Sequence, residues 1–152
     1  MYNFFQYNWQ VRDEWFSWCE QLAEGELLKE RIGGRGNILH TLLHIIDVEF
    51  SWIRAIQGIQ DIVIDFNEFT TTESVKELSN HYREEIDEFL LNGNSSSDHV
   101  VTASWMEGEF TKQEILHHII AHEIHHVGQL SIWARELGLK PVSSNVIFRG
   151  LF

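Results

Sequence analysis

The sequence predicts an all-α protein folded as a four-helix bundle, with a single domain spanning residues 1–152. Four segments carry apolar residues at helical spacing, and stretches rich in glycine, serine or asparagine separate them. The length suits one domain with a sizeable core, and a hydrophobic content of 43% is ordinary for a globular protein. Connections of ordinary length favour antiparallel neighbours, and the long link at residues 57–71 is compatible with a crossover between non-adjacent helices.

The first two expected helices are separated by a glycine-rich loop at residues 33–36. The first covers about Asn3–Glu24, and its apolar side comprises Phe4, Trp9, Trp15, Phe16, Cys19 and Leu22. The second follows Asn37, a good N-cap, and runs to Gln57, with Gly58 as the C-cap. Because the second helix is apolar around most of its circumference, we expect it to be buried on several sides.

The third helix is expected from Thr71 or Thr72 to near Leu91, before a loop at residues 92–98. The brief alternation at Val100–Trp105, with a turn around residues 107–109, is compatible with a short β-hairpin before the last helix.

The fourth helix is expected to begin after Thr111, because Glu114 stands three residues later in the spacing of a capping box. It runs to Leu137, with Gly138 as its C-cap. The main apolar stripe of this helix contains Ile115, Ile119, Leu130, Trp133 and Leu137. A second apolar strip lies beside it and comprises Leu116, Ile120, Ile124, Val127 and Ala134. We expect neighbouring helices or a second subunit to cover this strip, and we therefore predict a homodimer.

The most informative pattern of the sequence is the pair His122 and His126, four residues apart in the fourth helix. At about 100° per residue, both fall inside the main apolar stripe, whereas three other histidines lie outside it: His117, His118 and His125. A buried neutral imidazole needs one partner for its donor and another for its acceptor. A metal ion that binds one nitrogen of each ring would meet part of that need. The spacing indicates either a metal site or two structural histidines.

A stable metal site needs a third ligand, and the second helix offers His40 and His44. Spacing alone does not choose between them. Three imidazoles and an open fourth position are typical of a catalytic metal centre, and imidazole ligands favour Zn²⁺, with Ni²⁺ as the next choice. We therefore expect one divalent ion.

A competing interpretation is the H-E-x-x-H signature of zinc proteases, which residues 122–126 match. Glu123 would then be the general base. The extended form of the motif is absent, since Gln129 stands at the glycine position and no histidine follows His126. A metallohydrolase is therefore the least favoured alternative.

The composition limits the partners and the location of the protein. A formal net charge of −12 argues against nucleic acid, because nucleic-acid binding relies on Lys and Arg at phosphates. The single cysteine, Cys19, excludes an intramolecular disulfide, and we expect it to be a small buried hydrophobe. The sequence shows no signal peptide and no apolar run of about 18 residues, so we expect no membrane span. These absences favour a cytoplasmic location.

Four stretches of the chain resemble the DinB-like proteins, a damage-inducible family of metal-binding four-helix bundles. They are Tyr7-Asn8-Trp9, residues 42–52 (LLHIIDVEFSW), Glu107-Gly108, and residues 116–129 (LHHIIAHEIHHVGQ) followed by Leu137-Gly138 and Pro141. The resemblance covers nearly the whole chain in order. The family usually has Arg where Val127 stands, and this difference puts in doubt any role of that position in holding an anionic substrate.

The resemblance implies that His44, His122 and His126 together bind one divalent ion, and thus selects His44 over His40. It also implies an up-up-down-down bundle that often forms a homodimer. Related members are regarded as metal-dependent transferases or isomerases that use a low-molecular-weight thiol, so the expected partners are a small thiol and an electrophilic small molecule. The alternative is a non-enzymatic helical module that binds metal for a structural or stress-related role. Glu49 and His125 are candidates for holding the ligands in place.

Overall fold

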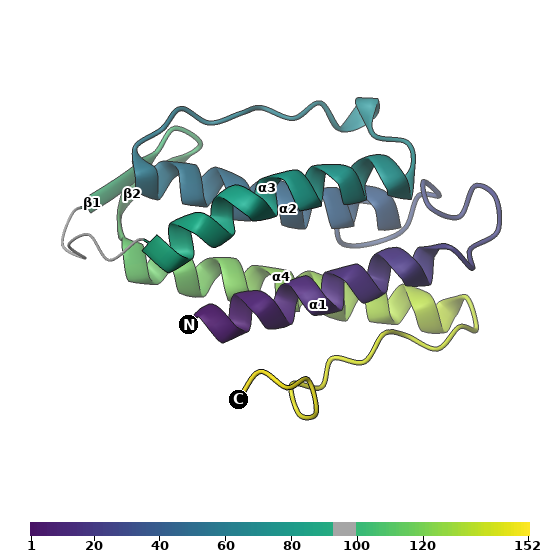
Figure 1. The fold of residues 1–152 in the computed structure, drawn as a ribbon. Coiled ribbons are helices and arrows are strands. Elements are labelled where there is room, and N and C mark those ends of the chain that lie inside the picture. Colours follow the sequence, from purple (N-terminus) through teal and green to yellow (C-terminus); the bar gives the residue numbers. More distant parts are fainter. Residues whose placement is uncertain (93–99) are drawn as a thin grey trace.

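The structure, a computed structural model, describes residues 1–92 and 100–152 and consists of four long helices with a short β-hairpin before the last one (Figure 1). The helices are α1 (Tyr2–Cys19), α2 (Ile38–Gln57), α3 (Thr72–Asn92) and α4 (Lys112–Glu136). A short 3₁₀ helix, η1, covers Phe66–Glu68 in the link between α2 and α3. The fold class predicted from the sequence is confirmed.

The helix directions are set by one long crossover. Figure 1 shows α1 and α4 running in one direction and α2 and α3 in the other, while residues 58–71 return along the whole length of the bundle. This up-down-down-up order differs from the up-up-down-down order that the resemblance implied. The difference arises because residues 20–37 reverse the chain at one end, so α2 runs antiparallel to α1 and only the link between α2 and α3 has to cross.

The ends of three helices follow the capping residues of the sequence. The Asn37 side chain accepts a hydrogen bond from the backbone N–H of His40, and Gly58 has the left-handed conformation expected of a residue that ends α2. Thr111 and Glu114 form the predicted capping box at the start of α4. The predicted start of α3 at Thr72 is also confirmed.

The first helix ends at Cys19 and not at Glu24 as expected. Beyond it, the backbone N–H groups of Gln21 and Leu22 bond to carbonyls three residues back, which tightens the chain into turns. The Gln21 side chain also donates to the Trp18 carbonyl, at 3.0 Å. Phe4, predicted on the apolar side, is more than one-third exposed.

The hairpin pairs β1 (Val100–Ala103) with β2 (Met106–Thr111) in antiparallel register. Its turn lies at Ser104 and Trp105, because Ala103 pairs with Met106. The predicted turn at residues 107–109 is therefore wrong, since these residues lie within β2. The loop predicted at residues 92–98 falls outside the described residues, except for Asn92, which ends α3.

The core fills the space between the four helices with large apolar side chains, and α2 contributes most of its circumference to it, as predicted. The predicted apolar strip of α4 is largely buried within the bundle. Leu116, Ile120, Val127 and Ala134 are buried, and of the strip only Ile124 is exposed. This burial removes the strip as an argument for a dimer.

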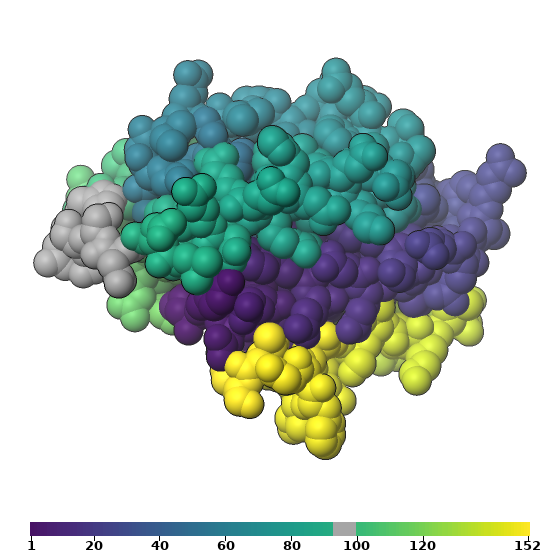
Figure 2. Space-filling model, viewed as in Figure 1, coloured from purple at the N-terminus to yellow at the C-terminus, as the bar shows by residue number. Residues whose placement is uncertain are grey.

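The C-terminal segment lies along α1 on the outside of the bundle (Figure 2). Tyr7 donates a hydrogen bond to the Ser144 carbonyl at 2.7 Å, and the Trp18 indole donates to the Lys140 carbonyl at 2.9 Å. In the part of the chain that the structure describes, no helix combines the length and apolar character needed to cross a membrane.

Candidate metal centre

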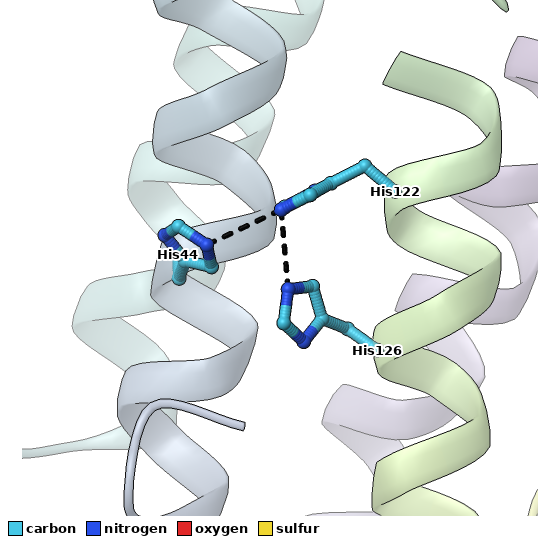
Figure 3. A group of neighbouring side chains, drawn as sticks. All are labelled: His44, His122 and His126. Atoms are coloured by element: carbon cyan, nitrogen blue, oxygen red, sulfur yellow. Dashed lines mark hydrogen bonds between the residues drawn. The ribbon is translucent and has the colours of Figure 1, made fainter. Parts of the chain in front are cut away.

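Three histidines from two packed helices converge on one point (Figure 3). His122 and His126 lie one turn apart on α4, and His44 faces them from α2. The Nε2 atom of His122 is 3.2 Å from Nε2 of His44 and 3.1 Å from Nε2 of His126. One ring nitrogen from each histidine lies within 4.8 Å of the other two. The structure therefore brings together the three residues that the resemblance selected.

The hydrogen-bonding capacity of these rings suits a cation at the point where they meet. His126 Nδ1 lies 2.7 Å from the amide oxygen of Gln129, which only accepts, so that nitrogen carries the proton and Nε2 keeps a lone pair. His122 Nε2 faces two other ring nitrogens and has one proton at most to offer them. A metal ion would satisfy the three converging nitrogens at once.

The histidines are held in the neutral form that a metal requires. Burial, together with the neighbouring imidazoles, lowers the pKa of His44 to about 4 and that of His122 to about 3. Burial also lowers the pKa of His126. Neutral rings at pH 7 leave their lone pairs free for coordination.

Gln129 fixes the orientation of His126 and links it to a further histidine. Its oxygen accepts from His126 Nδ1, and its Nε2 donates to His125 Nε2 at 3.2 Å. The sequence made His125 a candidate for holding the ligands, and the structure places it behind Gln129, without a hydrogen bond to a converging nitrogen. The role of Gln129 itself was missed, although its position three residues after His126, on the same helix face, is a signal that could have identified it.

The glycine loop packs directly behind Gln129. A Cβ atom on Gly34 would lie 2.7 Å from Thr41 Oγ1, 2.7 Å from the Trp133 ring and 3.2 Å from the Gln129 oxygen. The backbone N–H of Arg35 bonds to Thr41 Oγ1 at 3.0 Å, which holds this loop to the start of α2. The close approach therefore depends on a residue without a side chain at position 34.

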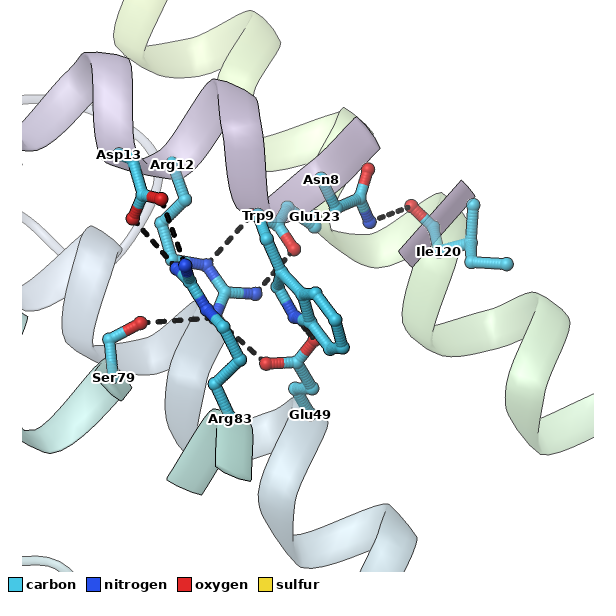
Figure 4. Close-up of polar contacts among 9 residues, drawn as sticks. All are labelled: Asn8, Trp9, Arg12, Asp13, Glu49, Ser79, Arg83, Ile120 and Glu123. Atoms are coloured by element: carbon cyan, nitrogen blue, oxygen red, sulfur yellow. Dashed lines mark hydrogen bonds and ion pairs between the residues drawn. The ribbon is translucent and has the colours of Figure 1, made fainter. Parts of the chain in front are cut away.

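Glu49 of α2 and Glu123 of α4 lie in a separate buried cluster (Figure 4). Arg12 donates to Glu123 through Nε (2.9 Å) and Nη2 (2.6 Å), and to Glu49 through Nη1 (2.8 Å). The Trp9 indole donates to the other Glu49 oxygen at 2.9 Å. The expectation that Glu49 holds a metal ligand is wrong, because its two carboxylate oxygens accept hydrogen bonds from Trp9 and Arg12.

This cluster also removes the role that the H-E-x-x-H motif would give to Glu123. Both of its carboxylate oxygens accept from Arg12, inside the bundle. A general base must be free to reach the reacting proton. The match to the zinc-protease signature is therefore a coincidence of helix composition.

Four other histidines contribute no ring nitrogen to this group. His40, the alternative third ligand, packs edge-to-face against Phe66 with ring centroids 5.6 Å apart. His117, His118 and His125 are exposed, as their place outside the apolar stripe predicted. Within the described residues, the three-histidine set is the one group of His, Cys, Asp and Glu side chains with a geometry suited to a metal.

A cavity of about 270 Å³ opens beside the histidine cluster and has His44 in its wall. The other lining side chains come from α2, the link after α2 and the hairpin turn, and they include Asp47, Ser51, Trp52, Asp61 and Trp105. His44 and His122 are themselves only half-buried. A small molecule in this cavity would be adjacent to one of the three histidines.

Comparison with known proteins agrees with the fold and with the resemblance. The profile of the DinB family matches residues 1–149. The uncharacterized protein YizA of Bacillus subtilis (strain 168) is 58% identical over 153 aligned residues, which cover 99% of this chain and 96% of the relative. The chain therefore belongs to the DinB family.

Proposed function

We propose that the protein binds one divalent ion, Zn²⁺ or Ni²⁺, through the Nε2 atoms of His44, His122 and His126. The observation that carries this proposal is the convergence of three ring nitrogens from α2 and α4 on one point, in rings that are neutral at pH 7. Both ions accept imidazole ligands readily. Metal binding would also join α2 to α4.

The proposed reaction is a metal-dependent substitution in which a low-molecular-weight thiol loses its proton to solvent, its sulfur forms a C–S bond with an electrophilic small molecule, and the leaving group of that molecule departs with the bonding electron pair. When bound, a divalent ion of this kind supplies a Lewis acid that can hold a thiolate or polarise an electrophile. Two features support an open site: the half-buried His44 and His122, and the cavity with His44 in its wall. The histidines would orient the ion, and the cavity would receive the substrate beside it.

The protein's own thiol is poorly suited to be the nucleophile. Cys19 is buried in α1, and burial raises its pKa to about 12, so almost no thiolate exists at neutral pH. A thiol-dependent reaction would need a thiol from solution. This property supports the use of a small thiol as a partner.

The alternative function is a metal-binding module without enzymatic activity. The position of the three histidines between α2 and α4 is compatible with this alternative, because a bound ion would stabilise the contact of the two helices. A cytoplasmic location and a homodimer remain proposals from the sequence. The exposed Ile124 and Ile132 on α4 are the large apolar residues of that helix still available to a second subunit.

A transferase assay distinguishes the enzyme from the module. The Zn²⁺- or Ni²⁺-loaded protein would be incubated with a panel of small thiols and a chromogenic aryl halide, and thioether formation would be followed against the uncatalysed rate. We expect a metal-dependent rate that is lost in His122→Ala. Equal rates for the loaded protein and His122→Ala across the panel would support the non-enzymatic module.

A further inference from the structure

Two carboxylates line the cavity beside His44. Asp47 of α2 and Asp61 of the following link both line it, and the charge of Asp61 makes ionisation of Asp47 less favourable. One oxygen of Asp61 is buried and has no hydrogen-bond partner within residues 1–92 and 100–152. A buried acceptor without a partner is costly, so the cavity favours a ligand that carries donors.

The nearby arginines do not neutralise this pair. Arg54 donates hydrogen bonds from Nε and Nη2 to the Gln60 carbonyl, at 2.8 and 2.6 Å. Its Nη1 lies 3.8 Å from a carboxylate oxygen of Glu85. The charge of Arg35 lowers the pKa of Asp47 without a hydrogen bond between them. The guanidinium of Arg35 lies over the Phe66 ring. Burial and Asp61 together raise the pKa of Asp47 to about 6, so Asp47 is still mostly ionised at pH 7. The cavity therefore holds net negative charge.

Two tryptophans also line this cavity. Trp52 of α2 and Trp105 of the hairpin turn meet edge-to-face, with ring centroids 5.3 Å apart. The hairpin thus adds an indole to the lining of the cavity that the two carboxylates also line. Indole faces attract organic cations, and the attraction adds to that of nearby carboxylates. The combination of two carboxylates and two indoles suits an alkylammonium group better than a carboxylate, a phosphate or a neutral alcohol.

We propose that this cavity is a subsite for the alkylammonium group of a small molecule whose donor atom reaches the three-histidine centre. This inference rests on the proposed metal site, and it specifies the class of thiol: an aminothiol, bound by its ammonium group at Asp47 and Asp61. Charge complementarity would select such a thiol over neutral and anionic ones. His44 lies in the wall of the same cavity, so one short molecule can occupy both places.

Thiol binding to the Co²⁺-substituted protein tests this inference, because a thiolate on Co²⁺ gives a charge-transfer absorption in the near ultraviolet. The probes are two aminothiols, cysteamine and 3-aminopropanethiol, their neutral counterparts 2-mercaptoethanol and 3-mercaptopropanol, and the anionic 3-mercaptopropionate. We expect at least one aminothiol to bind roughly tenfold more tightly than its neutral counterpart, the factor that about 1.4 kcal/mol provides. The anionic thiol should bind more weakly than either.

Asp61→Asn isolates the charge without a change of shape. It should reduce the preference for the aminothiol, because Asp47 remains as the only carboxylate of the pair, and leave the affinity for 2-mercaptoethanol unchanged. Glu88→Gln makes the same change of charge at an exposed position of α3 that does not line the cavity, so it should keep the preference.

The possible results separate the ammonium subsite from the metal site. A protein that binds Co²⁺ but binds aminothiols and neutral thiols equally well would overturn the ammonium subsite and leave the metal site standing. The same aminothiol preference in Asp61→Asn and Glu88→Gln would overturn the subsite as well. Failure to bind Co²⁺ at all would overturn the metal site itself.

Discussion

Gln129 connects the histidine cluster to the surrounding helix, and its removal should weaken metal binding. Without its oxygen, His126 Nδ1 loses the acceptor that keeps Nε2 free for the ion. We expect Gln129→Ala to lower Zn²⁺ affinity by about 10- to 100-fold, the usual effect of removing such a partner. Competition with a chromogenic chelator measures this affinity.

Two variants make the Gln129 result specific. Gln129→Glu keeps an acceptor for His126 and should retain most of the affinity, whereas Gln113→Ala removes an exposed side chain from the same helix and should have no effect. Wild-type affinity in Gln129→Ala would show that the His126 ring is oriented by other contacts.

The sequence predicts the position of the α4 histidines on the core-facing stripe, but it does not predict which residues surround them. Helical periodicity puts His122 and His126 on the core-facing stripe whatever lies opposite. It could not choose between His40 and His44, because that choice depends on how α2 is rotated against α4. Glu49 was misplaced for the same reason: its partner, Arg12, comes from a helix whose position no local pattern specifies.

The loop before α2 should be sensitive to a single methyl group. Gly33→Ala and Gly34→Ala both put a side chain at a positive φ, +93° and +52° respectively. Only the second also forces a Cβ to within 2.7 Å of Thr41 and Trp133. We expect Gly34→Ala to lower the free energy of unfolding by about 1–3 kcal/mol more than Gly33→Ala, as overpacking does.

Urea denaturation of both variants gives this difference directly. Gly34→Ala should also weaken metal binding, because its Cβ would crowd the Gln129 oxygen. If the two variants are equally stable, the loop moves aside easily and does not clamp Gln129.

The sequence predicted elements well where local chemistry determines them. The capping residues Asn37 and Thr111 placed the starts of α2 and α4. The end of α1 was missed because Leu22 continues the apolar pattern, whereas the backbone N–H groups of Gln21 and Leu22 form turns there. The hairpin turn was misplaced because Gly108 suggested a turn, whereas strand pairing at Ala103 and Met106 determines its position.

In the whole molecule, the buried Arg12 joins α1 to α2, α3 and α4. It pairs with Glu49 and Glu123 and also reaches Ser79 Oγ at 3.3 Å. Arg12→Met would leave two carboxylates buried without their cation, and we expect a loss of about 3–5 kcal/mol in the free energy of unfolding. Urea denaturation monitored by tryptophan fluorescence measures it.

Arg83 provides the matched control for this prediction. It forms a two-bonded pair with Asp13, but both side chains are partly exposed to solvent. Arg83→Met should therefore cost only about 1 kcal/mol, of which part is its contact with the Trp9 ring. Similar losses in the two variants would contradict a special role for the buried cluster.

The overall topology was the least predictable feature. Four amphipathic helices define a bundle, but their directions depend on where the chain reverses. The long link at residues 57–71 indicated a crossover between helices. In the structure this link is the crossover from α2 to α3. The exposed or buried state of the α4 strip likewise depends on the neighbouring helices and not on the strip itself.

The metal content of the protein is the most direct test of the three-histidine centre. Protein purified without a histidine tag would be reconstituted with Zn²⁺ or Ni²⁺, desalted and analysed for its elements. We predict close to one ion per chain, retained in His40→Ala and lost in His44→Ala. A content near zero in the wild-type protein under saturating metal would contradict the metal centre and leave the three histidines as structural residues.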